Sequence, residues 1–112
     1  MRASALSHDT LHILIAVADR ERHGYAILQD VRQRTSGQVT LSPSTLYSAI
    51  KRLLQDALIE ELDERPDPEH DDERRRYYRI TKAGRLAVTE ELGRLQRLIA
   101  DARTTGLLPK RA

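Results

Sequence analysis

The chain of 112 residues contains no cysteine, no tryptophan and no phenylalanine. The lack of cysteine excludes disulfides and thiolate metal ligands, and it agrees with a reducing compartment. No run approaches the length of about eighteen apolar residues that would cross a membrane, and the N-terminus has no signal-peptide pattern. We therefore expect a cytoplasmic protein with no membrane partner, whose length suffices for one domain with a modest core.

Catalytic motifs are missing as well. The sequence has neither a Gly-rich phosphate loop nor a nucleophile elbow. His8 and His12 stand four residues apart with Asp9 nearby, but no third convincing metal ligand accompanies them. A divalent ion could be held only loosely by Glu69, His70, Asp71 and Asp72. We expect no enzyme activity, no metal and no cofactor.

Charge is abundant but unevenly distributed. The formal net charge is +2, yet residues 60–79 hold nine acidic and five basic side chains, a net of −4, which leaves +6 for the remainder. Of the nineteen basic residues three are lysine, so sixteen are arginine. Arginine suits bidentate contacts with phosphate and guanine, although a GC-rich genome would also enrich it.

The most informative segment is residues 41–53, LSPSTLYSAIKRL. Ser42 suits the N-cap of a helix and Pro43 suits its first position. Apolar side chains recur at helical spacing and should point inward at Leu46, Ile50, Leu53 and Leu54. Short donors near the start of such a helix could reach base edges in the major groove of DNA. The outward residues are Ser44, Thr45, Tyr47, Ser48 and Lys51.

Two helices should precede this segment. The first begins after Ser7 and ends at about Asp19. Its expected buried stripe is Leu11, Leu14, Ile15 and Ala18. The second follows Gly24 and ends near Gly37. Its expected apolar face is Tyr25, Ile27, Leu28 and Val31.

Two antiparallel strands are predicted at residues 59–64 and 74–81. The segment between them contains two prolines, which cannot lie inside a ladder, so it is predicted to be a loop. The loop is acidic, whereas the returning strand begins with arginines. We expect this strand to dock on phosphates and the loop to stay away from them. The alternative is that the arginines pair across the hairpin with Glu60, Glu61 and Glu64.

A last helix is predicted from Lys82 to about Arg103, capped by Thr81 and followed by a flexible tail. Its apolar residues are spaced four, three, four and three positions apart, at Val88, Leu92, Leu95, Ile99 and Ala102. This spacing is typical of a two-helix seam and predicts a homodimer. The alternatives are packing on the first helix of the same chain and a swapped mixture of both.

Several motifs in this order are similar to those of the PadR family of bacterial transcriptional regulators. They are HGYAI at 23–27, LSPSTLYSAIKRL at 41–53, the pair at 58–59 and RRRYYRITKAG at 74–84. The resemblance covers roughly residues 7–95. It implies a mainly α fold with a small β-hairpin, the winged helix-turn-helix, in the compact subgroup with one helix after the wing. It also implies a homodimer on double-stranded DNA, usually a repressor, often released by a small hydrophobic effector.

This resemblance divides the chain into a winged helix-turn-helix at 1–81, a dimerisation helix at 82–104 and a tail at 105–112. A two-fold dimer predicts an inverted-repeat operator. The expected DNA-binding residues are Tyr25, Ser42, Ser44, Thr45, Tyr47, Ser48, Lys51, Arg74, Arg75 and Arg76. A speculative effector cavity would be lined by Leu11, Ile15, Leu92, Leu95 and Ile99. The rival function is a winged-helix module that binds protein and does not read DNA.

The sequence also departs from the family pattern. Serine stands at Ser44, where glycine is frequent, and at Ser48, where proline is frequent. Alanine stands at Ala57, where glycine is common. The loop of the hairpin is longer and more acidic than usual, which argues against its insertion into the minor groove. The last helix has no tryptophan that could stack on a planar drug.

Overall fold

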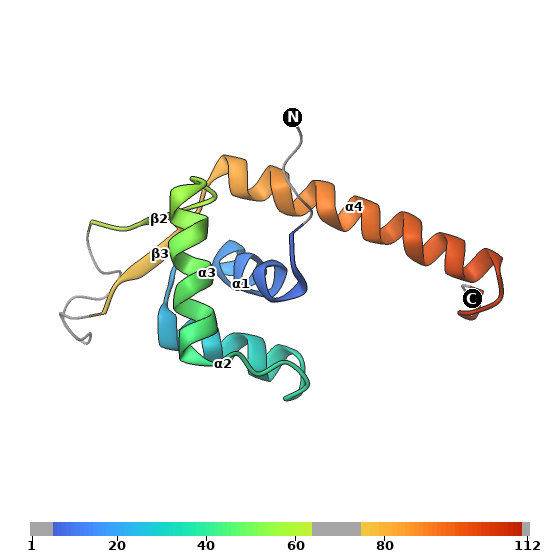
Figure 1. Cartoon of the computed structure of the whole chain (residues 1–112), viewed down its shortest axis with the longest axis horizontal. Helices are drawn as coiled ribbons and strands as arrows, with labels where there is room; N and C mark the ends of the chain where they lie inside the picture. The colour runs from blue at the N-terminus through green and yellow to red at the C-terminus, as the bar shows by residue number, and fades with distance from the viewer. Residues whose placement is uncertain (1–5, 64–74, 111–112) are drawn as a thin grey trace.

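The computed structural model describes residues 6–63 and 75–110 (Figure 1). No helix in these ranges is long and apolar enough to cross a membrane. The described residues form four helices and three short strands. In chain order these are α1 (His8–Asp19), β1 (Arg22–His23), α2 (Gly24–Arg34), α3 (Pro43–Gln55), β2 (Ile59–Glu61), β3 (Tyr77–Ile80) and α4 (Lys82–Thr104).

Helix α1 is the centre of the core and contacts α2, α4 and β3. Ile13, Leu14 and Ala16 are completely buried. The predicted stripe is therefore wrong in part, because Ile15 and Ala18 are only half-buried. A single stripe describes a helix that is covered on one side, whereas α1 is covered by three elements.

Helix α2 is fixed to the end of α1 by ion pairs. The guanidinium Nη2 of Arg22 lies 2.7 Å from the Asp19 carboxylate and 3.2 Å from that of Asp30. Arg34 Nη2 lies 2.9 Å from the same Asp30 carboxylate. The side chains of Arg22 and Asp30 are mostly buried, so solvent screens their attraction less than it would at the surface. These contacts hold the start of α2 in a defined orientation.

The apolar face of α2 is narrower than predicted. Ile27 and Val31 are completely buried and Leu28 is half-buried. Tyr25 is 59% exposed, so its predicted place on this face is wrong. Residues two positions apart on a helix do not share a face, and Ile27 already occupies the inner side.

The three strands form one antiparallel sheet in the order β1-β3-β2. Strand β3 pairs with β2 through Ile59 and Ile80, and with β1 through Arg22 and Tyr78. The sequence predicted only the β2–β3 hairpin, because a strand as short as β1 shows no alternation of polar and apolar residues. The predicted loop at residues 65–73 lies outside the described residues.

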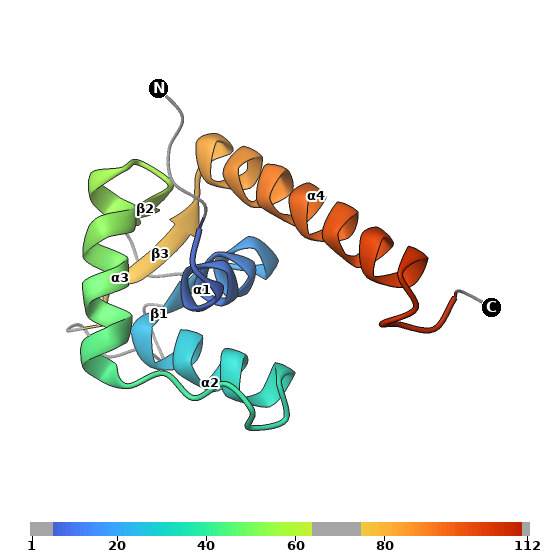
Figure 2. The same ribbon diagram turned by 45° about the vertical axis from the view of Figure 1, so that its right-hand side comes forward.

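Helix α4 crosses α1 and then projects beyond the domain (Figure 2). Its N-cap is Thr81, whose Oγ1 accepts a hydrogen bond of 3.0 Å from the amide of Gly84 and donates one of 2.7 Å to the carbonyl of Ala57. The radius of gyration is 16.0 Å. A compact domain of this length would have a radius of about 13 Å, and the projecting helix explains the difference.

Candidate nucleic-acid interface

Helix α3 presents a polar face to solvent, as the sequence predicted. Ser42 is the N-cap, and its Oγ accepts a hydrogen bond of 3.1 Å from the amide of Thr45. The inward side chains of Leu46, Ile50 and Leu53 are buried in the core. The outward residues, all exposed, are Ser44, Thr45, Tyr47, Ser48 and Lys51.

Tyr47 of α3 lies across the start of α2. A Cβ atom added to Gly24 would come within 2.9 Å of Tyr47 Cζ, so only glycine allows this approach. The tyrosine is still 52% exposed. Its ring therefore holds the two helices together while part of the side chain remains accessible to a ligand.

The start of α2 is also joined to the sheet through His23. The Nδ1 atom of His23 accepts a hydrogen bond of 3.2 Å from the amide of Ala26, which makes this side chain the N-cap of α2. The His23 ring meets Tyr77 edge-on at 5.2 Å between centroids, and Arg75 Nη1 lies 3.3 Å from His23 Nε2. Sequence reasoning missed His23, because histidine is not among the residues usually found at N-caps.

A hollow of about 480 Å³, here called the tyrosine–arginine hollow, gathers four of the predicted DNA-binding residues from separate parts of the chain. Burial raises the pKa of the Tyr78 phenol at its base, and nearby Glu61 raises it further, so this phenol stays neutral at physiological pH. No phenolate at Tyr78 therefore offsets the positive charge of the two arginines in the hollow. Its lining consists of His23, Gly24, Tyr25, Tyr47, Arg75, Arg76 and Tyr78.

The arginines of the returning strand partly follow the predicted alternative. Arg76 Nη1 lies 3.5 Å from the Glu61 carboxylate, and Arg79 Nε lies 3.1 Å from that of Glu60. These pairs are exposed, and such pairs contribute only about 0.2–1 kcal/mol to stability. A phosphate group could therefore take the place of the glutamate in either pair at little cost in stability. Arg74 and Glu64 lie outside the described residues.

The opposite flank of α3 has a different character. A groove of about 1100 Å³ separates α3 from the start of α1 and from α4. Asp9, Asp56 and Glu90 line it together with Arg52 and Arg94. Its acidic groups would repel phosphates, so the DNA backbone should lie on the tyrosine–arginine side. The α3 residues along this groove include Ser44, Thr45 and Ser48.

The predicted seam of α4 is only partly covered by its own chain. Val88 is buried, and Leu95 and Ala102 are half-buried. Leu92 and Ile99 are each 40% exposed. The seam therefore stays a prediction whose partner helix would come from another chain.

The predicted effector residues lie apart from the hollows described above for residues 6–63 and 75–110. Leu11 belongs to the core and is 5% exposed, while Ile15 is half-buried beside it. None of the five predicted effector residues lines either of the two cavities described above. An effector cavity between two chains stays a prediction.

The fold and this surface define a winged helix-turn-helix protein of the DNA-binding class. Helices α2 and α3 form the helix-turn-helix, and the β2–β3 hairpin is the wing beside it. The family model described as "Transcriptional regulator PadR-like family" matches residues 13–90. The chain belongs to this family of transcriptional regulators. Membership confirms the predicted family and agrees with the prediction that the chain is not an enzyme.

Sequence and structural similarity to known proteins support the assignment to this family. The chain is 39% identical to Transcriptional regulator Rv3488 of Mycobacterium tuberculosis over 91 residues, which covers 81% of this chain and 78% of that protein. A PadR family transcription regulator from Clostridium difficile R20291 superposes with a TM-score of 0.70 at 25% identity, covering 91% of this chain and 100% of that one. Bacillus subtilis PadR in complex with operator DNA shares the fold, with a TM-score of 0.65 at 17% identity over 77% of this chain and 47% of that one.

Proposed function

We propose that the chain is a homodimeric repressor that binds an inverted-repeat operator in double-stranded DNA. The observation that carries this proposal is the tyrosine–arginine hollow beside the exposed polar face of α3. Helix α3 would enter the major groove, where short side chains reach base edges. The proposed base-reading residues are Ser44, Ser48 and Lys51, with Ser42 and Thr45 at the start of the helix.

The tyrosine–arginine hollow would hold the phosphate backbone that flanks the groove. A guanidinium binds phosphate through two parallel hydrogen bonds, and a phenol can donate a third. Tyr25 and Tyr47 are more than half exposed, so part of each side chain is available for this contact. The proposed phosphate contacts are Tyr25, Tyr47, Arg75 and Arg76, together with Arg74, which lies outside the described residues.

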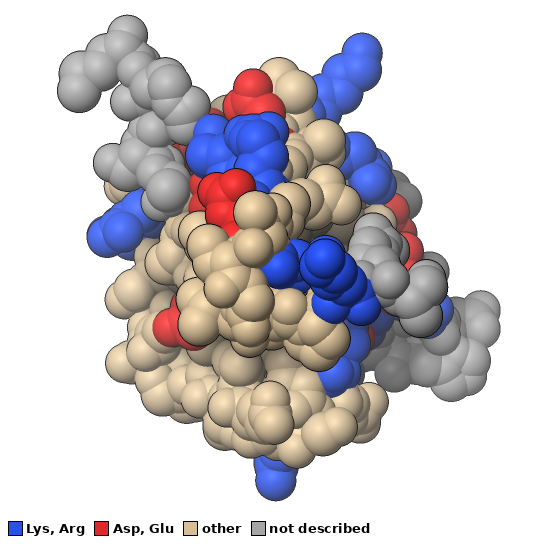
Figure 3. Space-filling view, turned by 90° about the vertical axis from the view of Figure 1, so that its right-hand side faces the viewer, with Lys and Arg blue, Asp and Glu red and all other residues tan. Residues whose placement is uncertain are grey.

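The projecting half of α4 supports a dimer. Burial of each large apolar side chain contributes roughly 1.5–3 kcal/mol, which is lost if Leu92 and Ile99 remain in water. Figure 3 shows the molecule from the side toward which α4 projects. Uncharged residues cover most of the lower half of this face. A two-fold dimer would place its recognition helices about 34 Å apart, one turn of DNA.

Repression and its release by a small hydrophobic effector are part of the same proposal. A dimer seated on an operator within a promoter would exclude RNA polymerase from it. Ile15 and Leu95 lie half-buried where α1 meets α4, and a second chain could close a cavity over them. A transcription assay on the promoter of the protein's own gene tests this, because added protein should lower transcript yield and a hydrophobic effector should restore it.

The DNA contact is tested by the double variant Arg75→Ala/Arg76→Ala. Each phosphate contact contributes about 0.9 to the slope of log affinity against log salt, so the slope should fall by about 1.8. The matched control is Arg97→Ala/Lys110→Ala, which removes the same charge from α4 and from the segment that follows it. An unchanged slope in the first variant would contradict docking by this strand. Failure of the wild-type protein to bind DNA or heparin at low salt would favour the protein-binding module instead.

A further inference from the structure

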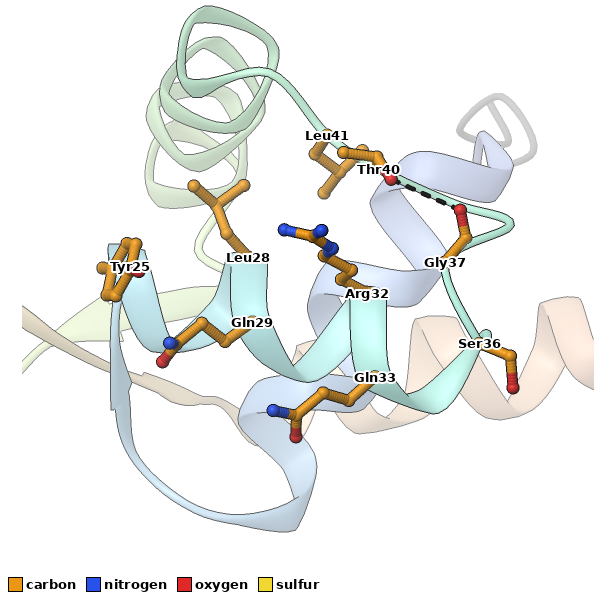
Figure 4. A pocket seen from close by; sticks show the side chains of 9 residues that line it. All are labelled: Tyr25, Leu28, Gln29, Arg32, Gln33, Ser36, Gly37, Thr40 and Leu41. Carbon is orange, nitrogen blue, oxygen red and sulfur yellow. Dashed lines mark hydrogen bonds between the residues drawn. The ribbon is translucent and has the colours of Figure 1, made fainter.

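A second hollow of about 480 Å³ lies over the outer face of α2 and its connection to α3 (Figure 4). Tyr25 closes one end of it, and Arg32 projects from α2 toward Thr40 and Leu41 (Figure 4). The other polar side chains of its lining are Gln29 and Gln33 of α2 and Ser36 and Thr40 of the connection to α3. None of the nine residues that line this hollow, here called the Arg32 hollow, is acidic.

Among the residues that the structure describes, Arg32 has no ion-pair partner, in contrast to its neighbour Arg34. Arg34 is bonded to the Asp30 carboxylate and donates a hydrogen bond of 3.1 Å to the carbonyl of His12. Arg32 is exposed and makes no ion pair with any residue of the described ranges. The fold therefore uses Arg34 for structure and leaves the guanidinium of Arg32 available to an anion.

The polar groups around Arg32 suit a phosphodiester. On the same helix Gln29 lies about one turn before Arg32 and Gln33 is the next residue after it, and each carries an amide N–H donor. On the opposite wall the Thr40 hydroxyl donates a long hydrogen bond of 3.4 Å to the carbonyl of Gly37, and it could turn from there to a phosphate oxygen (Figure 4). A phosphate oxygen accepts hydrogen bonds from all of these groups, and no carboxylate in the lining competes with it or repels it.

The Arg32 hollow continues the surface already assigned to DNA. Tyr25 lines both this hollow and the tyrosine–arginine hollow, and Leu41 joins it to the start of α3. When the second helix of a helix-turn-helix enters the major groove, the first helix crosses the DNA backbone beside it. The outer face of α2 is thus where a second stretch of backbone should pass.

We propose that Arg32, with Gln29, Gln33 and Thr40, binds a backbone phosphate of the operator. This inference rests on the proposed DNA-binding function and adds a contact on α2 to the contacts on the wing strand. Contacts on both α2 and the wing fix the orientation of α3 in the groove, as phosphate contacts generally do. They carry no sequence information themselves.

The test compares wild-type protein with Arg32→Ala, Arg32→Lys and the matched control Arg97→Ala by fluorescence anisotropy on a labelled duplex. The duplex comes from upstream of the protein's own gene, and a scrambled duplex is measured beside it. In Arg32→Ala the salt slope should fall by about 0.9, which corresponds to a roughly five- to tenfold loss of affinity at about 0.1 M salt. The loss should be equal on both duplexes, because a phosphate contact weakens binding uniformly. Arg32→Lys should keep the slope, and Arg97→Ala should match wild type.

Three outcomes would overturn this inference. An unchanged slope in Arg32→Ala, with wild type binding DNA normally, would refute the Arg32 contact and leave the proposed function standing. A loss confined to the native duplex would mean that Arg32 reads a base. If millimolar inorganic phosphate at constant ionic strength raised DNA affinity only while Arg32 was present, the hollow would hold a small free anion together with the DNA and would not contact the DNA backbone. Wild-type protein that bound no DNA would instead refute the proposed function itself.

Discussion

Two glycines mark the places where elements of this fold approach each other most closely. Gly24 begins α2 under the ring of Tyr47. Gly84 lies in the first turn of α4 against the backbone of Leu58 and the side chain of Ile80. The two neighbourhoods differ, because a tyrosine ring can swing away while a backbone carbonyl cannot. Substitutions at these glycines should therefore have different consequences.

Gly24→Ala should weaken DNA binding more than it lowers stability. The new methyl group would displace the Tyr47 ring from α2 and move a proposed phosphate contact. We expect a roughly tenfold loss of affinity, comparable with the loss of one hydrogen bond to a charged group, about 1.5 kcal/mol. Anisotropy on the native duplex and thermal unfolding measure the two effects separately. Equal affinity for the variant and wild type would show that Tyr47 does not contact DNA.

Gly84→Ala should destabilise the fold by about 1–3 kcal/mol, because the added Cβ would lie only 3.0 Å from the carbonyl carbon of Leu58 and 2.8 Å from Ile80 Cγ1. Gly93→Ala is the control on the same helix, since its nearest neighbour is Arg97 Nη1 at 3.8 Å. That change should stabilise the fold by about 0.5–1 kcal/mol through helix propensity. Urea unfolding of both variants checks the contrast, and equal destabilisation would contradict it.

At the scale of an element, the start of α3 combines two tasks in one side chain. Ser42 caps the helix and also lies at the proposed DNA surface. Ser42→Ala should lower the free energy of unfolding by about 1 kcal/mol through loss of the cap. Ser42→Asp should preserve stability, because aspartate caps as well as serine, yet weaken DNA binding because its carboxylate would face phosphates. If Ser42→Asp bound DNA as tightly as wild type, the start of α3 would not approach the backbone.

Elements with strong local signals could be predicted from the sequence. Helix α3 has its cap, its proline and its apolar spacing in one segment, and the structure places its ends at Pro43 and Gln55. Helix α4 likewise begins directly after its cap, Thr81. The stripe of α1 was mispredicted in part, because enclosure by three elements depends on tertiary contacts that a local pattern does not contain. Strand β1 was missed because its pairing partner is more than fifty residues away.

The residues of the candidate interface could be predicted from the sequence, but their arrangement on the surface could not. The hydroxyls of α3 and the wing arginines were recognisable from sequence. The groove lined by Asp9, Asp56 and Glu90 and the Arg32 hollow were not recognisable, because both depend on how α1, α2 and α4 pack around α3. Asp30 stands four residues before Arg34 and two before Arg32, a spacing that favours an ion pair with Arg34 on a helix. Only the position of Asp30 shows which of the two is bound within the fold.

At the scale of the whole molecule, the exposed seam on the projecting helix predicts that the chain is a dimer in solution. Ile99→Asp should raise the dimer dissociation constant at least about a hundredfold, since each subunit loses an apolar contact of roughly 1.5 kcal/mol or more. Arg97→Asp is the control, because Arg97 lies two positions away and faces outward from the seam. Sedimentation at micromolar concentration should find a dimer for wild type and the control, and a monomer for Ile99→Asp. A monomeric wild type would refute the seam.

The tyrosine–arginine hollow and α3 are proposed to bind a specific DNA sequence together. The measurement to make is fluorescence anisotropy of a duplex from upstream of the protein's own gene, titrated at two salt concentrations beside a scrambled duplex. We expect tight binding to the native duplex, weaker binding to the scrambled one, and loss of affinity for both as salt increases. No binding to either duplex at low salt would contradict this proposal.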